Sequence, residues 1–578
     1  MEPIPANAEL IDTSMDRNLP QTTQVFTPVA ANERIQALDV IRGFALIGIF
    51  LMNIEFFNRV ISDIGQGMPV GLTGADWLAS YFIAYFVAGK FWTIFSLLFG
   101  MGFAVMLTRS EAKGQKFIVP YLRRIFALAV FGICHHILIW PGDILFSYAV
   151  AALGLVMILF MPVKWLLASL AAAVSLAIAW QNNLTSGVAV MLSAVALFVF
   201  YLRSERGIRI RGFKVHGLAI ILFIAATLML LTGVFGFVIP AQAKLKGFLF
   251  SGALVLILAY LVAKYHQPAE KRSLRLGAGA YLLLFASMSV GTASQIWDWG
   301  GNIAKREAII ATMPEFDATK VTQAELKTLR AKKDKSEKEE VMLSLAENAS
   351  YEAKKAKNDE KERRVLSTGS YWEAVKLRAI HFSEHSANEL NTSFLFIAMF
   401  LIGYWFVRSG VMDNTSAHLP MFKRLALIAL PLGIGMGIAG SLLAVRATSN
   451  NESDIFYFAE SLLYIGNLPA CLGYVGLMVV MLHSQGPFAK VKVLAPYGRM
   501  ALTNYLSQSV ICSAIFYAYG LGLYGMPRAQ QVLVVVVVVT LQVLFSHWWL
   551  SKFLYGPMEW LWRAITYWKL PRFKIETL

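Results

Sequence analysis

The feature that most constrains this chain is the recurrence of apolar runs about 17 to 25 residues long, the length that crosses a lipid bilayer as a helix. They recur from about residue 38 to about residue 550, with one large interruption at 297–392. Of the 578 residues, 57% are hydrophobic and 15% are charged, a balance typical of proteins with many membrane spans. We therefore expect an all-α, polytopic transmembrane helix bundle.

The apolar runs divide the chain into about fourteen spans and five regions. The predicted spans are 38–57, 84–108, 119–140, 143–161, 164–180, 185–202, 217–239, 246–264, 276–296, 394–411, 424–445, 460–482, 501–521 and 531–550. The predicted regions are a cytoplasmic tail at 1–37, an N-terminal transmembrane bundle at 38–296, a charged extracytoplasmic helical insert at 297–392, a C-terminal transmembrane bundle at 393–550 and an interfacial aromatic and basic tail at 551–578.

The loops between the predicted spans carry Lys and Arg residues that indicate the orientation of the chain. Short cytoplasmic loops are rich in basic residues. With fourteen spans, the basic loops after the second, sixth, eighth, tenth and twelfth spans all fall on one side, together with the basic C-terminal tail. We therefore predict that the N and C termini are cytoplasmic and that the insert lies on the opposite side.

The insert contributes nothing to the net charge of +16. It holds 17 Lys or Arg and 17 Asp or Glu, which leaves 35 basic and 19 acidic residues elsewhere, mostly at the predicted cytoplasmic edges. Membrane lipids with anionic headgroups are sufficient partners for these residues, and nucleic acid is not implied. Within the insert, high helix propensity and a capping-box pattern at Thr322 and Glu325 predict a solvated helical arm, either a spacer or a docking element.

Several classes of protein are disfavoured by what the sequence lacks. The three cysteines, Cys134, Cys471 and Cys512, fall in apolar segments, so we expect free thiols rather than disulfides. The first 37 residues do not read as a cleaved signal peptide. No Walker loop, no GxGxxG before a helix and no GxSxG elbow is present, which disfavours nucleotide hydrolysis and hydrolase chemistry.

The first predicted span, LDVIRGFALIGIFLMNIEFF at 38–57, carries polar residues at both ends. Arg42 and Asn53 are separated by about 16 Å along a helix axis, so one lies near the cytoplasmic edge and the other towards the outer leaflet. Polar groups within spans usually face a cavity or a partner, so both are candidates for function. The alternative for Arg42 is snorkelling to inner-leaflet phosphates.

The segment GICHHILIWPGDILFSYA at 132–149 places His135 before a Pro-Gly corner and Asp143 after it. Both side chains are expected at the depth of Asn53. A neutral imidazole beside a carboxylate can deprotonate a hydroxyl or an amine, with the carboxylate fixing the tautomer. The alternatives are an interfacial histidine bonded to a carbonyl group and an aspartate that caps the next helix.

Two further clusters lie near the C terminus. In PYGRMALTNYLSQS at 496–509, Arg499 stands at the entrance of an apolar helix that carries Asn504 and Gln508. The segment GPMEWLWRAITYWKLPR at 556–572 is typical of an interfacial helix at the cytoplasmic surface, with Glu559 and Arg563 spaced to form an ion pair.

A metal site is not expected. His381 and His385 are spaced by one helical turn and are able to share a metal ion. No third ligand is evident in the sequence. We therefore predict no metal cofactor.

Several segments resemble the YeiB-like family of bacterial inner-membrane proteins, known as domain of unknown function 418. They are RIQALDVIRGFALIGIFLMNI, KFWTIFSLLFGMGFA, RRIFALAVFGICHHILIWPGDILFSYAV, GSYWEAVKLR with FLIGYWFVRSGVM, and GRMALTNYLSQSVI with the following YGLGLYG and GPMEWLWRAITY. They occur in the family's order at both ends and in the middle of the chain. The resemblance implies a location in the bacterial cytoplasmic (inner) membrane, whereas the family's function is poorly defined.

The first span is also similar to the first helices of two groups of transmembrane acyltransferases. Acyltransferase-3 enzymes carry Arg-Gly followed ten residues after the Gly by a catalytic His, and heparan-alpha-glucosaminide N-acetyltransferases carry Asn at that place. Here Arg42-Gly43 is followed by Asn53, but the histidine that the second group places about eleven residues further on is replaced by Ile64. His135, which fits the family pattern G-x-x-H before Trp and Gly-Asp, is then the candidate base, with His136 as a backup.

The resemblance leads to the hypothesis of a membrane acyltransferase. It would move an acyl group from cytoplasmic acetyl-CoA or another acyl-CoA to an envelope glycan, lipid or peptide acceptor outside. The residues expected to carry this function are Arg42, Arg499, Asn504 and Gln508 for the acyl-CoA and His135, Asp143 and Asn53 for catalysis. The alternatives are a proton-coupled transporter or flippase and a scaffold in which the insert recruits a partner, and a homodimer is left open.

Overall fold

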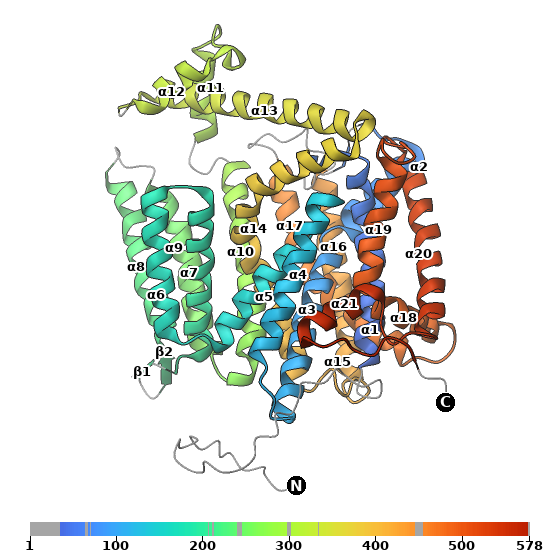
Figure 1. Cartoon of the computed structure of the whole chain (residues 1–578). Coiled ribbons are helices and arrows are strands. Elements are labelled where there is room, and N and C mark those ends of the chain that lie inside the picture. The colour runs from blue at the N-terminus through green and yellow to red at the C-terminus, as the bar shows by residue number, and fades with distance from the viewer. Residues whose placement is uncertain are drawn as a thin grey trace.

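The computed structural model of the chain is a bundle of long helices (Figure 1). It describes residues 35–63, 68–69, 71–205, 207–210, 213–239, 245–296, 302–332, 334–444 and 455–575. Among these residues, eleven helices are long and apolar enough to cross a membrane, judged by length and composition, and two further apolar helices, Leu145–Phe160 and Thr392–Arg408, are shorter. The prediction of an all-α, multi-pass membrane protein is confirmed.

The helices before the insert form a central and a peripheral group (Figure 1). The central group consists of α1 (Gln36–Asn53), α3 (Lys90–Ala112), α4 (Ile118–Leu138) and α5 (Leu145–Phe160), whereas α2 (Gly74–Phe82) lies at the opposite edge of the bundle beside the helix that starts at Arg528. The peripheral group consists of α6 (Val163–Trp180), α7 (Asn183–Arg203), α8 (Gly217–Val238) and α9 (Gly247–Tyr265), and α10 (Arg272–Ile296) stands between the two groups. A short antiparallel hairpin of β1 (Gly207–Ile210) and β2 (Phe213–His216), with Gly207 opposite His216, joins α7 to α8.

The predicted span 84–108 is interrupted in the structure. α2 continues into a π-helical turn at Ile83–Val87, and α3 begins at Lys90 after a break at Gly89. Gly89 has a φ of 80°, a conformation that favours glycine, and a side chain at this position would collide with Asn467. The helical run therefore starts earlier than the sequence predicts and changes direction at the glycine.

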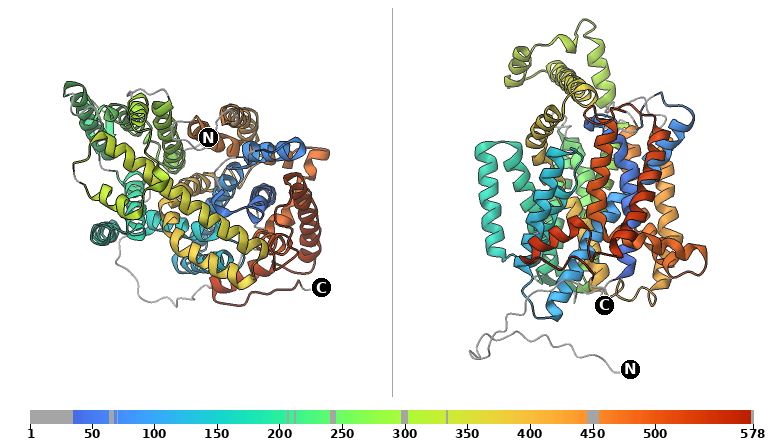
Figure 2. Two further views of the ribbon diagram at one scale, coloured as in Figure 1. Left: turned by 90° about the horizontal axis from the view of Figure 1, so that it is seen from above. Right: turned by 45° about the vertical axis from the view of Figure 1, so that its right-hand side comes forward.

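The charged insert is helical, as predicted, and covers one end of the bundle. It forms α11 (Asn302–Ala311), α12 (Gln323–Ala331), α13 (Glu337–Thr368) and the first half of α14 (Tyr371–Arg408). The predicted capping box of Thr322 and Glu325 is confirmed, and the same motif starts α13 and α14. Seen from above, α13 crosses over the bundle (Figure 2). The apolar half of α14 then descends into the centre of the bundle.

The C-terminal helices pack on the same core as the N-terminal ones. They are α15 (Leu419–Arg424), α16 (Leu430–Ala444), α17 (Phe456–Leu482), α18 (Leu494–Arg499), α19 (Ala501–Phe516), α20 (Arg528–Leu550) and α21 (Pro557–Tyr567). One cluster of buried apolar residues extends from α1 through α3, α5 and α14 to α17 and α19. The two predicted bundles therefore share one core.

The predicted span 501–521 corresponds to the shorter α19. The helix ends at Phe516, and the amide of Ala518 then donates a hydrogen bond to the carbonyl oxygen of Leu366 in α13. The chain thus leaves the helix to contact the insert before it can complete a span of the predicted length.

The two ends of the bundle differ in what covers them (Figure 1). α1 begins at the end where α18 and α21 lie, which we call the terminal end. The insert covers the other end, which we call the insert end. The terminal end is the one predicted to face the cytoplasm. Residues 1–34 of the predicted N-terminal tail lie outside the described residues.

Candidate functional site

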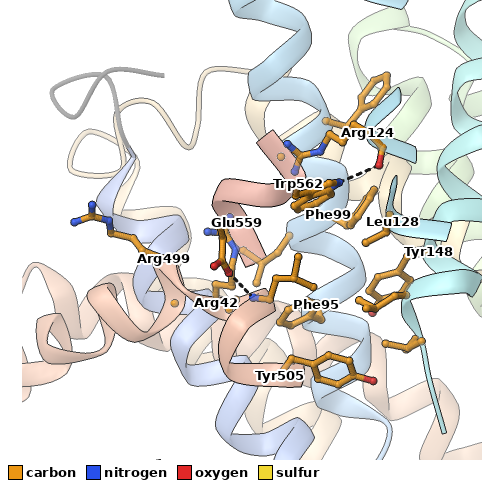
Figure 3. Close-up of a pocket in the computed structure, with 18 of the residues that line it drawn as sticks. Arg42, Phe95, Phe99, Arg124, Leu128, Tyr148, Arg499, Tyr505, Glu559 and Trp562 are labelled. Atoms are coloured by element: carbon orange, nitrogen blue, oxygen red, sulfur yellow. Dashed lines mark hydrogen bonds between the residues drawn. The ribbon is translucent and has the colours of Figure 1, made fainter. Parts of the chain in front are cut away.

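A cavity of about 230 Å³ lies between α1, α3, α4, α5, α18, α19 and α21. Its wall is mostly aromatic and aliphatic, as shown by Phe95, Phe99 and Tyr148 (Figure 3). Arginine residues also line it: Arg42, Arg124, Arg499 and Arg563. A second cavity of about 170 Å³ adjoins it at the terminal end and shares Arg42, Arg499 and Arg563. A cationic mouth at the terminal end thus adjoins a mostly apolar interior.

The crossing of α1 and α18 brings two of the predicted residues to this mouth. Gly43 packs against the carbonyl oxygen of Leu494, and Gly498 packs against the carbonyl oxygen of Asp39. A Cβ atom at either glycine would collide with the opposing backbone, so only glycine permits this close approach. Arg42 and Arg499 are the sequence neighbours of these glycines, and both line both cavities. The prediction that they belong to one site agrees with this geometry.

The mouth carries more positive than negative charge. Arg42 pairs with Asp39 at 2.9 Å, and the second cavity adds Arg109. Glu559 also lines both cavities, but its carboxylate accepts hydrogen bonds from the Leu502 amide at 2.7 Å and the Thr503 hydroxyl at 2.6 Å. Because four arginines (Arg42, Arg109, Arg499 and Arg563) and two acidic residues (Asp39 and Glu559) line the second cavity, the mouth suits a ligand that carries several negative charges.

The aromatic helix near the C terminus is a wall of the cavity. Glu559 of α21 caps the first turn of α19, and Arg563 lies over the ring of Tyr555 at 4.4 Å. The predicted ion pair between Glu559 and Arg563 is therefore wrong, because the start of α19 supplies amide donors for the carboxylate. Trp562 donates to the Arg124 carbonyl at 3.0 Å and stacks on its guanidinium (Figure 3).

His135 and Asp143 form a buried pair at the other end of the cavity. His135 Nδ1 lies 2.8 Å from Asp143 Oδ1, and both side chains are 1% exposed. Asp143 Oδ2 accepts a hydrogen bond from the Phe146 amide at 2.9 Å, so the aspartate also caps α5. Asp143 thus both contacts His135 and caps the next helix, and its catalytic role stays a prediction. With Nδ1 bonded to the carboxylate, the tautomer leaves the lone pair on Nε2.

His135 and Asp143 are not among the described residues that line the cavity, but His135 packs against one that is. Its Nε2 is buried and has no hydrogen-bond partner among the described residues. The His135 ring lies 5.2 Å from the ring of Tyr505, which lines the cavity together with Ile144. In Figure 3, Tyr505 lies at the opposite end of the labelled residues from Trp562 and Arg124. The apolar interior thus joins the cationic mouth to the surroundings of the His135–Asp143 pair.

Arg378, which sequence analysis missed as a site residue, fixes the corner that carries this pair. Its guanidinium donates to the carbonyl oxygens of Ile137, Leu138 and Ile139 at 2.9–3.1 Å, which satisfies the last turn of α4. The side chain is 2% exposed. A sequence signal existed, because Arg378 ends the motif GSYWEAVKLR, but its partners lie about 240 residues away.

The segment 365–378, where α13 ends and α14 begins, closes the insert end of the site, and we call it the elbow. Val365, Leu366 and Ala374 share a buried cluster with Trp140, which follows His135 at the corner. Just before the elbow, Glu362 accepts a hydrogen bond from the Ile61 amide at 3.1 Å. Burial raises the pKa of Glu362 to about 7. The elbow therefore covers the site at the insert end, which is the side on which the sequence predicts the acceptor.

Asn53 is buried at the end of α1, but it is not among the described residues that line the cavity. Two residues further on, Glu55 pairs with Arg528 at 3.2 Å and with Arg59 at 2.8 Å. The polar outer end of α1 thus joins the bundle to α20. The predicted catalytic role of Asn53 stays a prediction, and Ile64 lies outside the described residues.

Asn504 and Gln508 lie in a buried network that holds α19 to α18 and α20. Asn504 Nδ2 donates to the Tyr497 carbonyl at 3.0 Å and to Ser546 at 3.1 Å. Gln508 Nε2 donates to the Tyr497 hydroxyl at 2.8 Å and to Gln542 at 3.0 Å. Neither is among the described residues that line the cavity, so the structure brings Arg42 and Arg499 together without these two.

We predict that Gln508→Leu lowers stability without weakening the binding of CoA. The change removes two buried hydrogen bonds and leaves Gln542 partly unpaired, at a cost of about 1–2 kcal/mol. The thermal midpoint of the purified protein in detergent should fall, while its calorimetric affinity for CoA stays within twofold of the wild-type value. A large loss of affinity for CoA with an unchanged thermal midpoint would instead indicate that Gln508 contacts the bound CoA.

The fold brings a third histidine to His381 and His385. His136 Nε2 lies 3.2 Å from His381 Nδ1, and the His381 and His385 rings stack at 4.1 Å. His385 Nδ1 is bonded to the His381 carbonyl oxygen at 3.0 Å. No group of three ligands suited to a metal ion occurs among the described residues. His136 points to this cluster and His135 to Asp143, so the two neighbouring histidines have different surroundings.

The fold and the cavity define a polytopic membrane protein with a buried polar site at the end of an arginine-lined cavity. The family model described as "Protein of unknown function (DUF418)" matches residues 406–569, which contain α15 to α21. Residues 406–569 thus match this family, as the sequence predicts, and a part of the chain is similar to YeiB.

Three bacterial proteins illustrate the similarity. The uncharacterized protein YxaH of Bacillus subtilis (strain 168) is 26% identical over 546 residues, 93% of this chain and 96% of that protein. An uncharacterized 39.9 kDa protein from the amylase 3' region of Bacillus acidopullulyticus is 39% identical over 137 residues, 24% of this chain and 37% of that protein. The uncharacterized protein YeiB of Escherichia coli (strain K12) is 41% identical over 95 residues, 16% of this chain and 24% of that protein. No solved structure matches the chain.

Proposed function

We propose that the protein is an acyltransferase of the bacterial inner membrane. It moves an acyl group, such as acetyl, from cytoplasmic acyl-CoA to an envelope glycan, lipid or peptide on the other side. The observation that supports the proposal is an arginine-lined cavity whose wall includes Tyr505 and Ile144, next to the buried His135–Asp143 pair.

The mouth supplies the groups that a CoA ester needs. Arg42, Arg499 and Arg563 line both cavities, and guanidinium groups bind phosphate through paired, charge-assisted hydrogen bonds. The aromatic walls formed by Phe95, Phe99 and neighbouring residues then accept the uncharged arm and the acyl group. This arrangement orients the thioester towards the blind end of the cavity.

The His135–Asp143 pair supplies the base. His135 Nε2 takes the proton from the acceptor hydroxyl or amine as its oxygen or nitrogen bonds to the thioester carbon. The carbon–sulfur bond then breaks, and the imidazolium returns the proton to the departing CoA thiolate. Asp143 keeps the ring in the required tautomer and stabilises the transient positive charge. No metal is needed for these steps.

The test of donor binding is calorimetry with acetyl-CoA, longer acyl-CoAs and dephospho-CoA analogues. Arg42→Ala should weaken the binding of acyl-CoA by about 10- to 100-fold, since a hydrogen bond to a charged group contributes about 1.5–3 kcal/mol. The same change should weaken the binding of dephospho-CoA analogues by a smaller factor. Lys492→Ala, which removes an exposed cation on the nearby loop, is the matched control and should bind normally.

A proton-coupled transporter or flippase is the second candidate, favoured by a different observation. Lys90 is 1% exposed, and its ammonium group donates to the Tyr85 carbonyl at 2.6 Å beside the break in the helix at Gly89. Buried charges at interrupted helices are typical of transport sites. If no acyl-CoA binds to the purified protein, the transporter becomes the better hypothesis.

A further inference from the structure

One cationic side chain of the larger cavity, Arg124 of α4, has no role in the proposed mechanism. It lines this cavity but not the second one, whereas Arg42, Arg499 and Arg563 line both. Its guanidinium carbon lies 3.8 Å from the centre of the Trp562 ring. In Figure 3, Arg124 lies beside Trp562 and away from Arg499. The larger cavity therefore has a second cationic position, apart from the mouth.

The Arg124 guanidinium has no carboxylate partner among the described residues. It stacks on Trp562, and the Trp562 indole N–H donates to the backbone carbonyl oxygen of Arg124 at 3.0 Å. Glu559 lines the same cavity, but both of its oxygens accept hydrogen bonds from the first turn of α19. Stacking on an aromatic ring offsets only part of the cost of keeping a charge in a membrane segment. The N–H groups of Arg124 can therefore bind an anion in the cavity.

The preceding residue of α4 forms the same kind of pair outside the cavity. Arg123 lies over the ring of Trp568 at 5.4 Å, and both side chains are exposed. Neither is among the described residues that line the two cavities. Two successive arginines thus stack on two tryptophans of the C-terminal segment, but the pair of Arg124 and Trp562 lines the cavity. Stacking fixes the guanidinium plane before a ligand binds, so less side-chain entropy is lost on binding.

We propose that the Arg124–Trp562 pair is a phosphate subsite of the cavity, separate from the mouth. A guanidinium group binds a phosphate through two parallel hydrogen bonds and keeps its charge at physiological pH. The phosphate belongs either to the acyl-CoA donor or to the head group of a membrane phospholipid. The first source rests on the proposed acyl transfer, and the second does not.

The donor fits two separate cationic positions because acyl-CoA carries phosphate at two places. Its ribose phosphate lies at the nucleoside end, and its diphosphate joins the nucleoside to the pantetheine arm. The mouth, where Arg42→Ala is expected to weaken dephospho-CoA analogues less, then binds the ribose phosphate. Arg124 binds the diphosphate in the cavity whose apolar wall receives the arm.

The donor arm of the test is calorimetry with acetyl-CoA and acetyl-dephospho-CoA on the purified full chain, in detergent without phospholipid. Arg124→Gln should weaken the binding of both ligands by the same factor, about 10- to 100-fold, because both carry the diphosphate. Arg42→Ala should instead weaken acetyl-CoA by the larger factor. Arg123→Gln is the matched control, because it removes the exposed cation next in sequence, and it should bind both ligands like the wild type.

The lipid arm measures the thermal midpoint in mixed micelles with phosphatidylglycerol or with diacylglycerol, which lacks phosphate. If the bound phosphate belongs to a lipid, phosphatidylglycerol should raise the midpoint of the wild type and of Arg123→Gln equally. It should not raise the midpoint of Arg124→Gln. Arg124→Lys keeps the charge but loses the paired hydrogen bonds, and it replaces Arg124→Gln in both arms if that variant does not fold.

The outcomes separate this inference from the proposed function. A loss of binding in Arg124→Gln but not in Arg123→Gln, in either arm, supports the subsite and identifies the source of the phosphate. Wild-type binding by Arg124→Gln in both arms would overturn the subsite, and a lower thermal midpoint with unchanged binding would indicate a structural pair. If the wild type binds no acyl-CoA but the lipid arm separates the two variants, the proposed function fails and the subsite stands. If the wild type binds neither ligand, both fail.

Discussion

Replacing His135 with Ala is expected to abolish acyl transfer, with a fall in kcat of about 10²- to 10⁴-fold and no more than a twofold change in affinity for CoA. The reason is that Nε2 of His135 is the candidate general base, and general base catalysis contributes rate enhancements of that size. In the proposed function the donor phosphates bind at the arginines that line the two cavities, so donor binding should not depend on the imidazole. Release of the CoA thiol and calorimetry measure the two properties separately.

Two further variants test whether the loss of turnover is specific to the His135–Asp143 pair. Asp143→Asn keeps an oxygen that can cap α5 through the Phe146 amide, but it removes the charge that stabilises the imidazolium. It should therefore fold normally and lose much of the turnover. His136→Ala is the control, because His136 is bonded to His381 on the insert side. Wild-type turnover in His135→Ala would contradict the assignment. A loss of turnover in His136→Ala but not in His135→Ala would also contradict it.

The architecture could be predicted from the sequence because it depends on local patterns. Apolar runs of membrane length identify most of the spans, and the capping box at Thr322 was placed correctly because both of its residues lie within one turn. The predictions fail where contacts between segments far apart in the sequence determine the local structure. α19 ends at Phe516 because Ala518 bonds to Leu366, and Glu559 caps α19 instead of pairing with Arg563.

The candidate site could be predicted only in part, for a similar reason. The structure brings Arg42 and Arg499 to the same cavities, and this depends on Gly43 and Gly498, each of which packs against the backbone of the other helix. Asn504 and Gln508 were expected in the binding site because polar residues in an apolar helix suggest a ligand. In the structure they form hydrogen bonds to α18 and α20. The spacing of polar residues along a helix does not distinguish ligand binding from hydrogen bonding between helices.

The elbow raises the question of how an external acceptor reaches His135. At the insert end, Trp140 stacks on Phe57 at 4.4 Å, and Val365 and Leu366 pack in the same cluster. Polar contacts also hold this cover: Glu362 and Asp359 bond to Ile61 and Ser62 after α1, Leu366 bonds to Ala518, and Arg378 bonds to the corner after His135. In the proposed function, the elbow must move for transfer across the membrane.

Locking the elbow is therefore expected to stop transfer to an external acceptor. The Ala518 amide donates a 2.9 Å hydrogen bond to the Leu366 carbonyl oxygen, so these two residues are neighbours and are chosen for an engineered disulfide. The variant Leu366→Cys/Ala518→Cys is made in a chain with Cys134, Cys471 and Cys512 replaced by Ala. Proteoliposomes with acetyl-CoA on the terminal side and glucosamine on the insert side should lose about 10²-fold in rate on oxidation and recover on reduction.

The binding of CoA distinguishes a closed elbow from a damaged protein. Because the mouth lies at the terminal end, the oxidised variant should bind CoA with wild-type affinity, and each single-cysteine variant should transfer normally under oxidising conditions. If transfer continues at the wild-type rate after complete cross-linking, the acceptor reaches His135 by another route. A path from the terminal end would then be required, and donor and acceptor would enter through the same mouth.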